Sequence, residues 1–253
     1  MLAGKRIGAW ALSACLCASA VWGAADYARE KKWADEILPG IVVGEPVTLT
    51  DAGGRSFLGL YTEARGAKGA VVVVHGMGVH PDWGLVGVLR SQLADLGYTT
   101  LSVQMPVLAA EAKPEAYEKL FPEAAERLAA AVAYLQAKGY RKIALVSHSM
   151  GARMSGYYLV NHGNPPVAAW VAIGHSGQFK EPQNLKLPVL DLYGEADFPQ
   201  VLEAAPRRAA ALERIAGSAQ VAVKGADHFF NGQESALLAE VRAFLDRTLA
   251  SSR

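Results

Sequence analysis

The sequence predicts a single α/β domain built on a doubly wound, mostly parallel β-sheet with an antiparallel start. Apolar, β-branched runs alternate along the chain with segments of helical periodicity, which is typical of repeated βα units. One of these runs, Ala70–Val74, is continuously apolar, as expected for a parallel strand buried on both faces. The 253 residues are 51% apolar and 19% charged, which suits one sizeable core and excludes a disordered chain.

Composition excludes several classes of function. The net charge is +1 and there is no basic block, so a nucleic-acid-binding patch is not expected. Two cysteines are too few for a disulfide scaffold or a cysteine-based zinc site. The chain has no His-x-x-x-His pair, no compact acidic cluster and no glycine-rich phosphate-binding motif. We therefore expect neither a metal nor a cofactor.

Residues 1–25 resemble an export signal. Lys5 and Arg6 precede an uncharged stretch, Ile7–Ala25, that ends in small residues, as in a secretory signal peptide cleaved before Ala24 or after Ala25. Two other fates stay open. The stretch is about long enough to remain as a membrane anchor, and the Leu-Ser-Ala-Cys sequence ending at Cys15 resembles a lipobox, which would make Cys15 a lipidation site. We expect export to the periplasm or cell envelope, or secretion, with membrane association only through this segment.

The mature chain begins with a polar linker or short helix over residues 26–40, and a single domain follows over residues 41–253. Two strands, Ile41–Thr50 and Ser56–Ala64, flank Asp51-Ala52-Gly53-Gly54, a strong hairpin turn signal. The next expected elements are strand Ala70–Val74, a helix with Leu85, Leu89, Leu93 and Leu96 on one face, strand Tyr98–Val103 and helix Pro122–Lys138.

The same alternation continues to the C-terminus. The expected elements are strand Ile143–Val146, helix Gly151–Val160, strands Val167–Ile173 and Pro188–Tyr193, helix Gln200–Ile215, strand Gln220–Val223 and a final helix with Leu237, Val241, Phe244, Leu245 and Leu249 on one face. In a sheet of this kind, ligands bind at the carboxyl edge of the strands.

A candidate nucleophile follows the strand that ends at Val146. Ser147-His148-Ser149-Met150-Gly151 lies between a buried strand and a helix, the setting of a nucleophile elbow, in which Ser149 projects above the sheet. Small residues must flank the serine because strand, nucleophile and helix pack closely there. Gly151 meets that need, whereas Ser147 stands where glycine is usual, which leaves the elbow geometry to be tested.

Ser149 needs a base, and the base needs a carboxylate to orient it. Asp197 lies just beyond the strand that starts at Pro188, and His228 lies on the loop after the last strand. This serine, acid, histidine order is the one expected in the fold. Glu195, in the turn, is the second choice for the acid, and Asp191, in mid-strand, is expected to be structural.

A tetrahedral intermediate also needs hydrogen-bond donors. His75-Gly76-Met77-Gly78 follows the buried strand, and by position the N–H groups of Met77 and Met150 would form the oxyanion hole. A simple glycine-rich turn is the alternative for this stretch. His75, Gly76, His148 and His175 are further candidates for the pocket wall.

These motifs resemble those of the α/β-hydrolase superfamily from about Ile41 to Leu249. More narrowly, the sequence from His75 to Trp83, the strand ending at Pro106 and the serine-for-glycine elbow resemble a group of exported bacterial α/β-hydrolase-like proteins of unassigned substrate. The resemblance implies acyl transfer to water, in which Ser149 attacks, His228 moves the proton and Asp197 orients the imidazole.

The sequence leaves little chain for a cap domain. Only Gly174–Lys186 separates two strands where caps are usually inserted, and Gln104–Phe121 is long enough for a small flap, so we expect an open or lightly covered site. The leading hypothesis is an exported serine hydrolase, carboxylesterase-, lipase- or thioesterase-like, acting on a small-molecule or lipid-like acyl substrate. The alternative is a non-catalytic envelope binding protein that keeps the fold as a scaffold.

Overall fold

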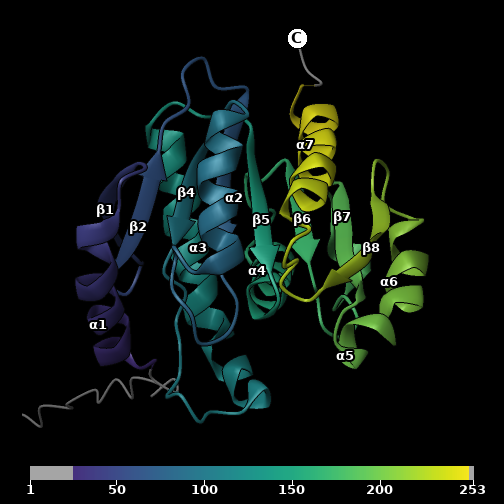
Figure 1. Cartoon of the computed structure of the whole chain (residues 1–253), viewed down its shortest axis with the longest axis horizontal. Coiled ribbons are helices and arrows are strands. Elements are labelled where there is room, and N and C mark those ends of the chain that lie inside the picture. The colour runs from purple at the N-terminus through teal and green to yellow at the C-terminus, as the bar shows by residue number, and fades with distance from the viewer. Residues whose placement is uncertain (1–24, 251–253) are drawn as a thin grey trace, which may run out of the picture.

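The computed structural model describes residues 25–250, which form one eight-stranded sheet covered by helices (Figure 1). The strand order is β1-β2-β4-β3-β5-β6-β7-β8. β2 is antiparallel to its neighbours β1 and β4. The other six strands, β3 to β8, run parallel to one another. The strands are β1 (Glu45–Thr50), β2 (Ser56–Thr62), β3 (Gly69–Val74), β4 (Tyr98–Val103), β5 (Ile143–His148), β6 (Ala169–Ile173), β7 (Val189–Ala196) and β8 (Ala219–Asp227). The predicted mixed, mostly parallel sheet is confirmed.

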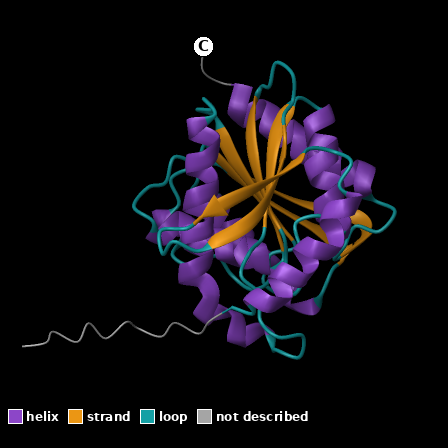
Figure 2. Cartoon of the chain, turned by 90° about the vertical axis from the view of Figure 1, so that its left-hand side faces the viewer, coloured by secondary structure: helices purple, strands orange, loops and turns teal. Residues whose placement is uncertain are grey.

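Helices cover both faces of the twisted sheet (Figure 2). On one face α2 (Gly84–Asp95) and α7 (Glu234–Ala250) pack against Val71 and Val73 of β3. On the other face α3 (Phe121–Ala137) and α4 (Met150–Asn161) pack against Val72 and Val74. Successive side chains of β3 therefore pack into two separate hydrophobic cores, because side chains alternate between the faces of a strand. This explains why the strand has no polar position.

The first strand is shorter than its sequence predicts. Pairing begins at Glu45, opposite Tyr61, rather than at Ile41. The preceding Gly44 has a φ of +77°, and a Cβ there would lie 2.4 Å from the Tyr61 carbonyl oxygen. An extended strand cannot pass through this left-handed residue, so Val42 stays outside the sheet and is 91% exposed. β2 likewise ends at Thr62 rather than Ala64.

The helix predicted over Gln200–Ile215 is two helices, α5 (Pro199–Leu202) and α6 (Ala205–Leu212). Pro206 lies in the first turn of α6. Proline has no N–H to donate to the carbonyl four residues earlier, so a helix continuing through Leu202 loses a hydrogen bond and meets the ring. The break directs the chain around the edge of the site described below.

Residues 27–37 form a helix, α1 (Tyr27–Ile37), whose first turn is capped by the Asp26 side chain. Glu30 pairs with the buried Arg127 of α3 at 2.9 Å, and the Asp26 N–H donates to the Val107 carbonyl at 2.7 Å. The N-terminal helix is thus held on the domain by polar contacts, one of them a buried ion pair.

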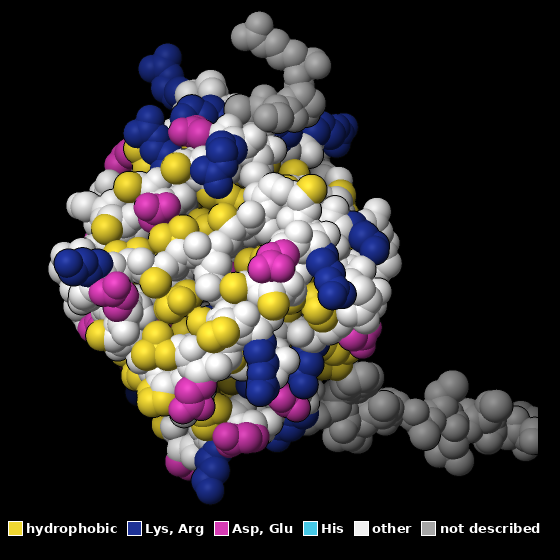
Figure 3. All heavy atoms as spheres, turned by 90° about the vertical axis from the view of Figure 1, so that its right-hand side faces the viewer, with side chains coloured by type: hydrophobic (Ala, Val, Ile, Leu, Met, Phe, Trp, Pro, Cys, Tyr) yellow, Lys and Arg dark blue, Asp and Glu magenta, His cyan; other side chains and the backbone are white. Residues whose placement is uncertain are grey.

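The predicted leader lies outside the described residues, apart from Ala25, and so do both cysteines. Across residues 25–250 no helix combines the length and hydropathy needed to cross a bilayer. On the side of the molecule turned toward the viewer in Figure 3, basic and acidic side chains are interspersed, with hydrophobic side chains between them. That face has no large patch of a single charge.

Candidate active site

Three strand ends bring Ser149, His228 and Asp197 together. Ser149 follows β5, His228 follows β8 and Asp197 follows β7. The Ser149 hydroxyl lies 3.0 Å from Nε2 of His228, and Nδ1 of His228 lies 2.6 Å from a carboxylate oxygen of Asp197. Asp197 and His228 are 5% and 4% exposed. Each separation is a hydrogen-bond distance, and the arrangement is the one that a nucleophile, its base and an orienting acid require.

Ser149 occupies a sharp turn between β5 and α4, with φ 55° and ψ −121°. This conformation is strained for a residue with a side chain, and such strain persists only where the surroundings fix it. Gly151 permits the turn, because a Cβ there would lie 2.3 Å from the His75 carbonyl oxygen. Gly76 packs against the serine itself, where an added Cβ would lie 3.2 Å from that of Ser149. The geometry is that of a nucleophile elbow.

Ser147, the residue that replaces the usual glycine, is accommodated by specific hydrogen bonds. Its hydroxyl accepts from the Trp170 indole N–H at 2.7 Å and donates to the Val171 carbonyl at 3.2 Å. Both partners lie on the neighbouring strand β6. Ser147 therefore satisfies a buried indole without distorting the turn, a role that the sequence did not reveal.

Three contacts fix the position of His228, one at its backbone and two at its ring. Nε2 of His148 donates to the His228 carbonyl oxygen at 2.9 Å, and the Phe198 ring stacks on the imidazole with centroids 4.2 Å apart. Gly174, directly after β6, has a φ of +57°, and a Cβ there would lie 2.9 Å from Cε1 of His228. Sequence reasoning missed both Phe198 and Gly174. The signal for Gly174 was a glycine at the end of a buried strand.

The carboxylates near the end of β7 face different partners. One oxygen of Asp197 accepts from His228 and from the Phe198 N–H, the latter at 2.7 Å. Glu195, the second choice for the acid, is exposed and accepts from the Gly225 N–H at 3.2 Å, so it does not reach the imidazole. Asp191 is fully buried in mid-strand and pairs with Arg208 at 2.8 Å.

Met77 and Met150 both line the cavity beside Ser149. Met150 is the first residue of α4, and Met77 belongs to the loop after β3. Neither N–H donates to a protein acceptor in the described part of the chain. Both donors are therefore free to bind an oxygen atom in the cavity.

Of the four pocket candidates, only His175 lines the cavity. His75 points into the core, where its Nε2 accepts from the Met105 N–H at 2.9 Å and burial lowers its pKa to about 3. Gly76 lies behind the serine, and His148 lies behind His228, where burial lowers its pKa to about 4. His75, Gly76 and His148 thus support the site without facing it: His75 is held by the Met105 N–H, and His148, the last residue of β5, is held by the His228 carbonyl. Burial also lowers the pKa of His175, to about 3.

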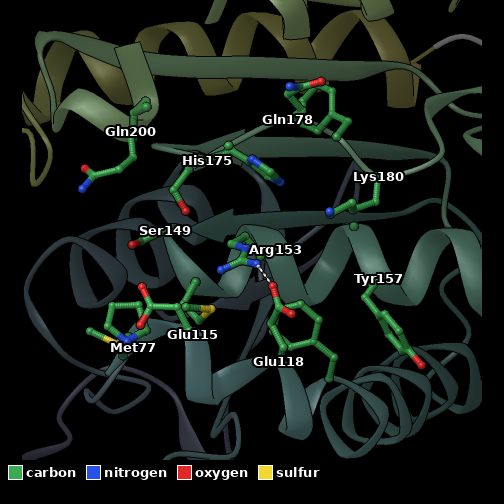
Figure 4. A pocket seen from close by; sticks show the side chains of 18 of the residues that line it. Met77, Glu115, Glu118, Ser149, Arg153, Tyr157, His175, Gln178, Lys180 and Gln200 are labelled. Atoms are coloured by element: carbon green, nitrogen blue, oxygen red, sulfur yellow. Dashed lines mark hydrogen bonds and ion pairs between the residues drawn. The ribbon is translucent and has the colours of Figure 1, made fainter. Parts of the chain in front are cut away.

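The cavity has a volume of about 1150 Å³ (Figure 4). Its walls are α4, the segment η2 (Pro114–Leu120) and the loop after β6, which contains the short helix η3 (Pro182–Asn184). Figure 4 shows Ser149 at one side, with Arg153 and Tyr157 successively farther along the cavity. The predicted flap is present as η2, and within residues 25–250 no large helical cap covers Ser149. Arg153, Tyr157 and Phe179, which sequence reasoning missed, also line the cavity. Arg153 and Tyr157 follow Ser149 at intervals of four residues, and this helical spacing was the signal that could have predicted their position.

Comparison with known proteins places the chain in a family. The family described as "Protein of unknown function (DUF3530)" matches residues 29–125 and 109–247. The chain belongs to this family. No curated protein matches it. Within the described residues no group of three or more His, Cys, Asp or Glu side chains is arranged to hold a metal ion.

Solved structures with similar folds are α/β hydrolases. The structures include a dienelactone hydrolase from Anabaena variabilis, with 20% identity and a TM-score of 0.63 over 80% of this chain and 98% of that one. An α/β serine hydrolase without lid from Xanthomonas campestris has 16% identity and a TM-score of 0.66 over 84% and 98%. Est1E from Butyrivibrio proteoclasticus has 14% identity and a TM-score of 0.63 over 81% and 99%. This DUF3530 chain therefore has the α/β-hydrolase fold, whereas the narrower resemblance to exported bacterial proteins stays a prediction.

Proposed function

We propose that this protein is an exported serine hydrolase that cleaves an ester or thioester through an acyl-enzyme. The observation that carries the proposal is the continuous hydrogen-bonded path from Ser149 through His228 to Asp197 at one end of a large cavity. The hydrolase folds of the structural neighbours support the same reaction class. The export signal read in residues 1–25 supports a location in the cell envelope.

In the first half-reaction the Ser149 oxygen attacks the acyl carbonyl carbon while its proton passes to Nε2 of His228. The Asp197 carboxylate, hydrogen-bonded to Nδ1, stabilises the imidazolium that forms. The carbonyl oxygen becomes an oxyanion, and the N–H groups of Met77 and Met150, two residues that line the cavity, donate to it.

Collapse of this intermediate breaks the bond to the leaving oxygen or sulfur, which takes the proton from His228. Water then attacks the acyl-serine, giving up a proton to His228, and the released serine takes that proton back. The cycle returns every group to its starting state. It uses only water as co-reactant.

Labelling with a fluorophosphonate tests the proposal. We expect one covalent adduct at Ser149, found by peptide mass spectrometry, and none in Ser149→Ala. Ser155→Ala is the matched control, because Ser155 is a buried serine of α4 that lies outside the cavity. Absence of an adduct in folded protein would refute the mechanism and favour the non-catalytic binding protein. N-terminal sequencing of protein recovered from the cell envelope tests export separately.

A further inference from the structure

The cavity extends well beyond the reacting groups, along one face of α4. Ser149, Arg153, Gly156 and Val160 line it at spacings of three or four residues, which places them on one side of a helix. Val160 is eleven residues after Ser149, which corresponds to a rise of about 16 Å at 1.5 Å per residue. The groove that they define, the α4 groove, is thus elongated rather than a small pocket around the serine.

The inner wall of the α4 groove is mostly apolar, and the buried His175, which packs against Trp170 and Phe179, is its polar member. Trp170, Phe179 and Leu185 line it and are 0%, 6% and 5% exposed. At Gly156 the helix has no side chain, and the Trp170 ring closes the gap, 3.2 Å from where a Cβ would be. An apolar surface of this kind binds hydrocarbon by removing it from water.

The outer rim of the cavity is charged. Glu118, Lys180 and Glu181 line this rim and are exposed. Arg153 leans to the flap side, where it pairs with Glu118 and lies 5.5 Å from the Phe121 ring (Figure 4). Its charge is therefore matched by the flap, and its side chain forms a wall of the groove. The contrast between apolar inner wall and charged rim suits an amphiphile.

The chemistry of the proposed reaction decides which part of the substrate enters the groove. The leaving group must be protonated by His228, so it lies beside that ring and the exposed Phe198. The acyl part remains attached to Ser149, the N-cap of α4 and the start of the groove. The acyl chain attached to Ser149 can therefore extend into the α4 groove.

We propose that the α4 groove is an acyl-chain site and that the substrate is an ester or thioester of a long, unbranched fatty acid. This inference rests on the proposed function. A groove of about 16 Å holds a chain of about a dozen carbons, given C–C bonds of about 1.5 Å in zigzag. Short acyl groups leave most of the apolar wall unused.

The test is a pair of ester series on the full chain. In the acyl series, p-nitrophenyl esters from acetyl to hexadecanoyl, we expect kcat/KM to rise about two- to fourfold per methylene up to about twelve carbons and then to level off. In the alcohol series, acetate esters of lengthening alcohols, we expect little dependence on length. A flat acyl profile, or length dependence only in the alcohol series, would overturn the proposal.

Two substitutions locate the effect in the groove. Val160→Trp fills the far end and should shorten the preferred acyl chain by several carbons, whereas Tyr157→Ala widens the groove and should raise activity on the longest esters relative to the shorter ones. Val42→Trp, the same substitution at an exposed valine outside the cavity, is the control and should leave the profile unchanged. An unchanged profile in both groove variants would contradict the assignment.

Binding without turnover separates this inference from the function on which it rests. Dodecanoate should bind the Ser149→Ala protein in calorimetry, with a negative heat-capacity change, and Val160→Trp in the same background should weaken the binding at least tenfold. Binding without ester hydrolysis by the wild type would retain the groove and refute the hydrolase. Hydrolysis with a flat acyl profile and no dodecanoate binding would retain the hydrolase and refute the groove.

Discussion

Asp191 and Asp197 are both buried and lie within or just after β7, yet they have different partners. Asp191 is 0% exposed and pairs with Nε of Arg208, whose Nη1 donates to the carbonyls of Gly177 and Val201. Asp197 lies one residue beyond the strand and pairs with His228. The first pair ties β7 to α6 and to the loop after β6, and the second pair leads to Ser149.

The difference follows from position along the strand. In mid-strand a side chain faces the layer that covers the sheet, and there a permanently charged arginine is a suitable partner. Burial raises the pKa of Asp191, although Arg208 and Gln220 oppose this. Beyond the strand end the chain turns over the edge of the sheet, and a titratable imidazole can reach a reactive group. A shift of a few residues thus gives one aspartate an arginine partner and the other an imidazole that reaches Ser149.

Replacement of each aspartate by asparagine should separate the two roles, and this is the largest effect expected. Asp197→Asn removes the charge that orients and stabilises the imidazole, so kcat should fall by about 10³- to 10⁴-fold. Asp191→Asn should change kcat by less than about tenfold and act mainly through stability. Steady-state ester hydrolysis by the folded variants measures both. The reverse pattern would show that Asp191 is the catalytic acid.

For the free energy of unfolding, loss of the Asp191–Arg208 pair should have a larger effect than loss of the Asp197 charge. Arg208→Met leaves Asp191 as an unpaired buried carboxylate, so the free energy of unfolding should fall by about 3–5 kcal/mol. Urea denaturation at pH 7 measures the loss. Adding Asp191→Leu to Arg208→Met should restore part of it, since neither charge of this pair then remains. If Asp197→Asn destabilised the protein more than Arg208→Met, the pair Asp197–His228 would be the structural one, contrary to this prediction.

Sequence reasoning located Ser149, His228 and Asp197 because each follows an apolar strand, and parallel strands end at the same edge. It could not tell which way a loop side chain turns. His75 and His175 both follow buried strands, but only His175 lines the cavity. The direction depends on tertiary contacts, such as the Met105 N–H that binds His75.

The burial of two arginines could also not be predicted from the sequence. Arg127 and Arg208 are 0% exposed, although arginine is rarely buried unless paired. Their partners, Glu30 and Asp191, are 97 and 17 residues away, and no local pattern links them. The break at Pro206, by contrast, was visible as a proline within a predicted helix.

Acid should destabilise the protein through His175, which is buried on the loop after β6. Burial, with Arg208 and Arg153 adding to it, lowers the pKa of His175 to about 3, and an unfolded histidine titrates near 6.5. Between these values the unfolded state binds the proton and the folded state does not, so stability falls as pH decreases from about 6.5 toward 4. His175→Asn should reduce this slope by up to about 1.4 kcal/mol per pH unit. Urea denaturation from pH 7 to 4.5 measures the slope, with His162→Asn, at an exposed histidine, as control.

Replacement of His148 should have the smallest effect on activity. The effect should arise at His228, the partner of Asp197, and not at the Asp191–Arg208 pair. His148→Phe keeps a ring against His228 but leaves the His228 carbonyl without its hydrogen bond, at a cost of about 1–2 kcal/mol in unfolding free energy. We expect kcat to fall about three- to tenfold with KM unchanged, because a tilted imidazole transfers the proton less well while the acyl groove is untouched. His162→Phe, at the exposed end of α4, is the matched control.

The size of the loss decides what His148 does. Burial lowers its pKa to about 4, so near pH 7 it is a neutral donor and carries no charge for the imidazolium to feel. A loss as large as that of Asp197→Asn would therefore mean that His148 moves a proton itself, and the pair Asp197–His228 would no longer be sufficient. A loss near tenfold, with no change in the pH at which activity appears, would leave Asp197 as the only residue that acts on His228 by charge.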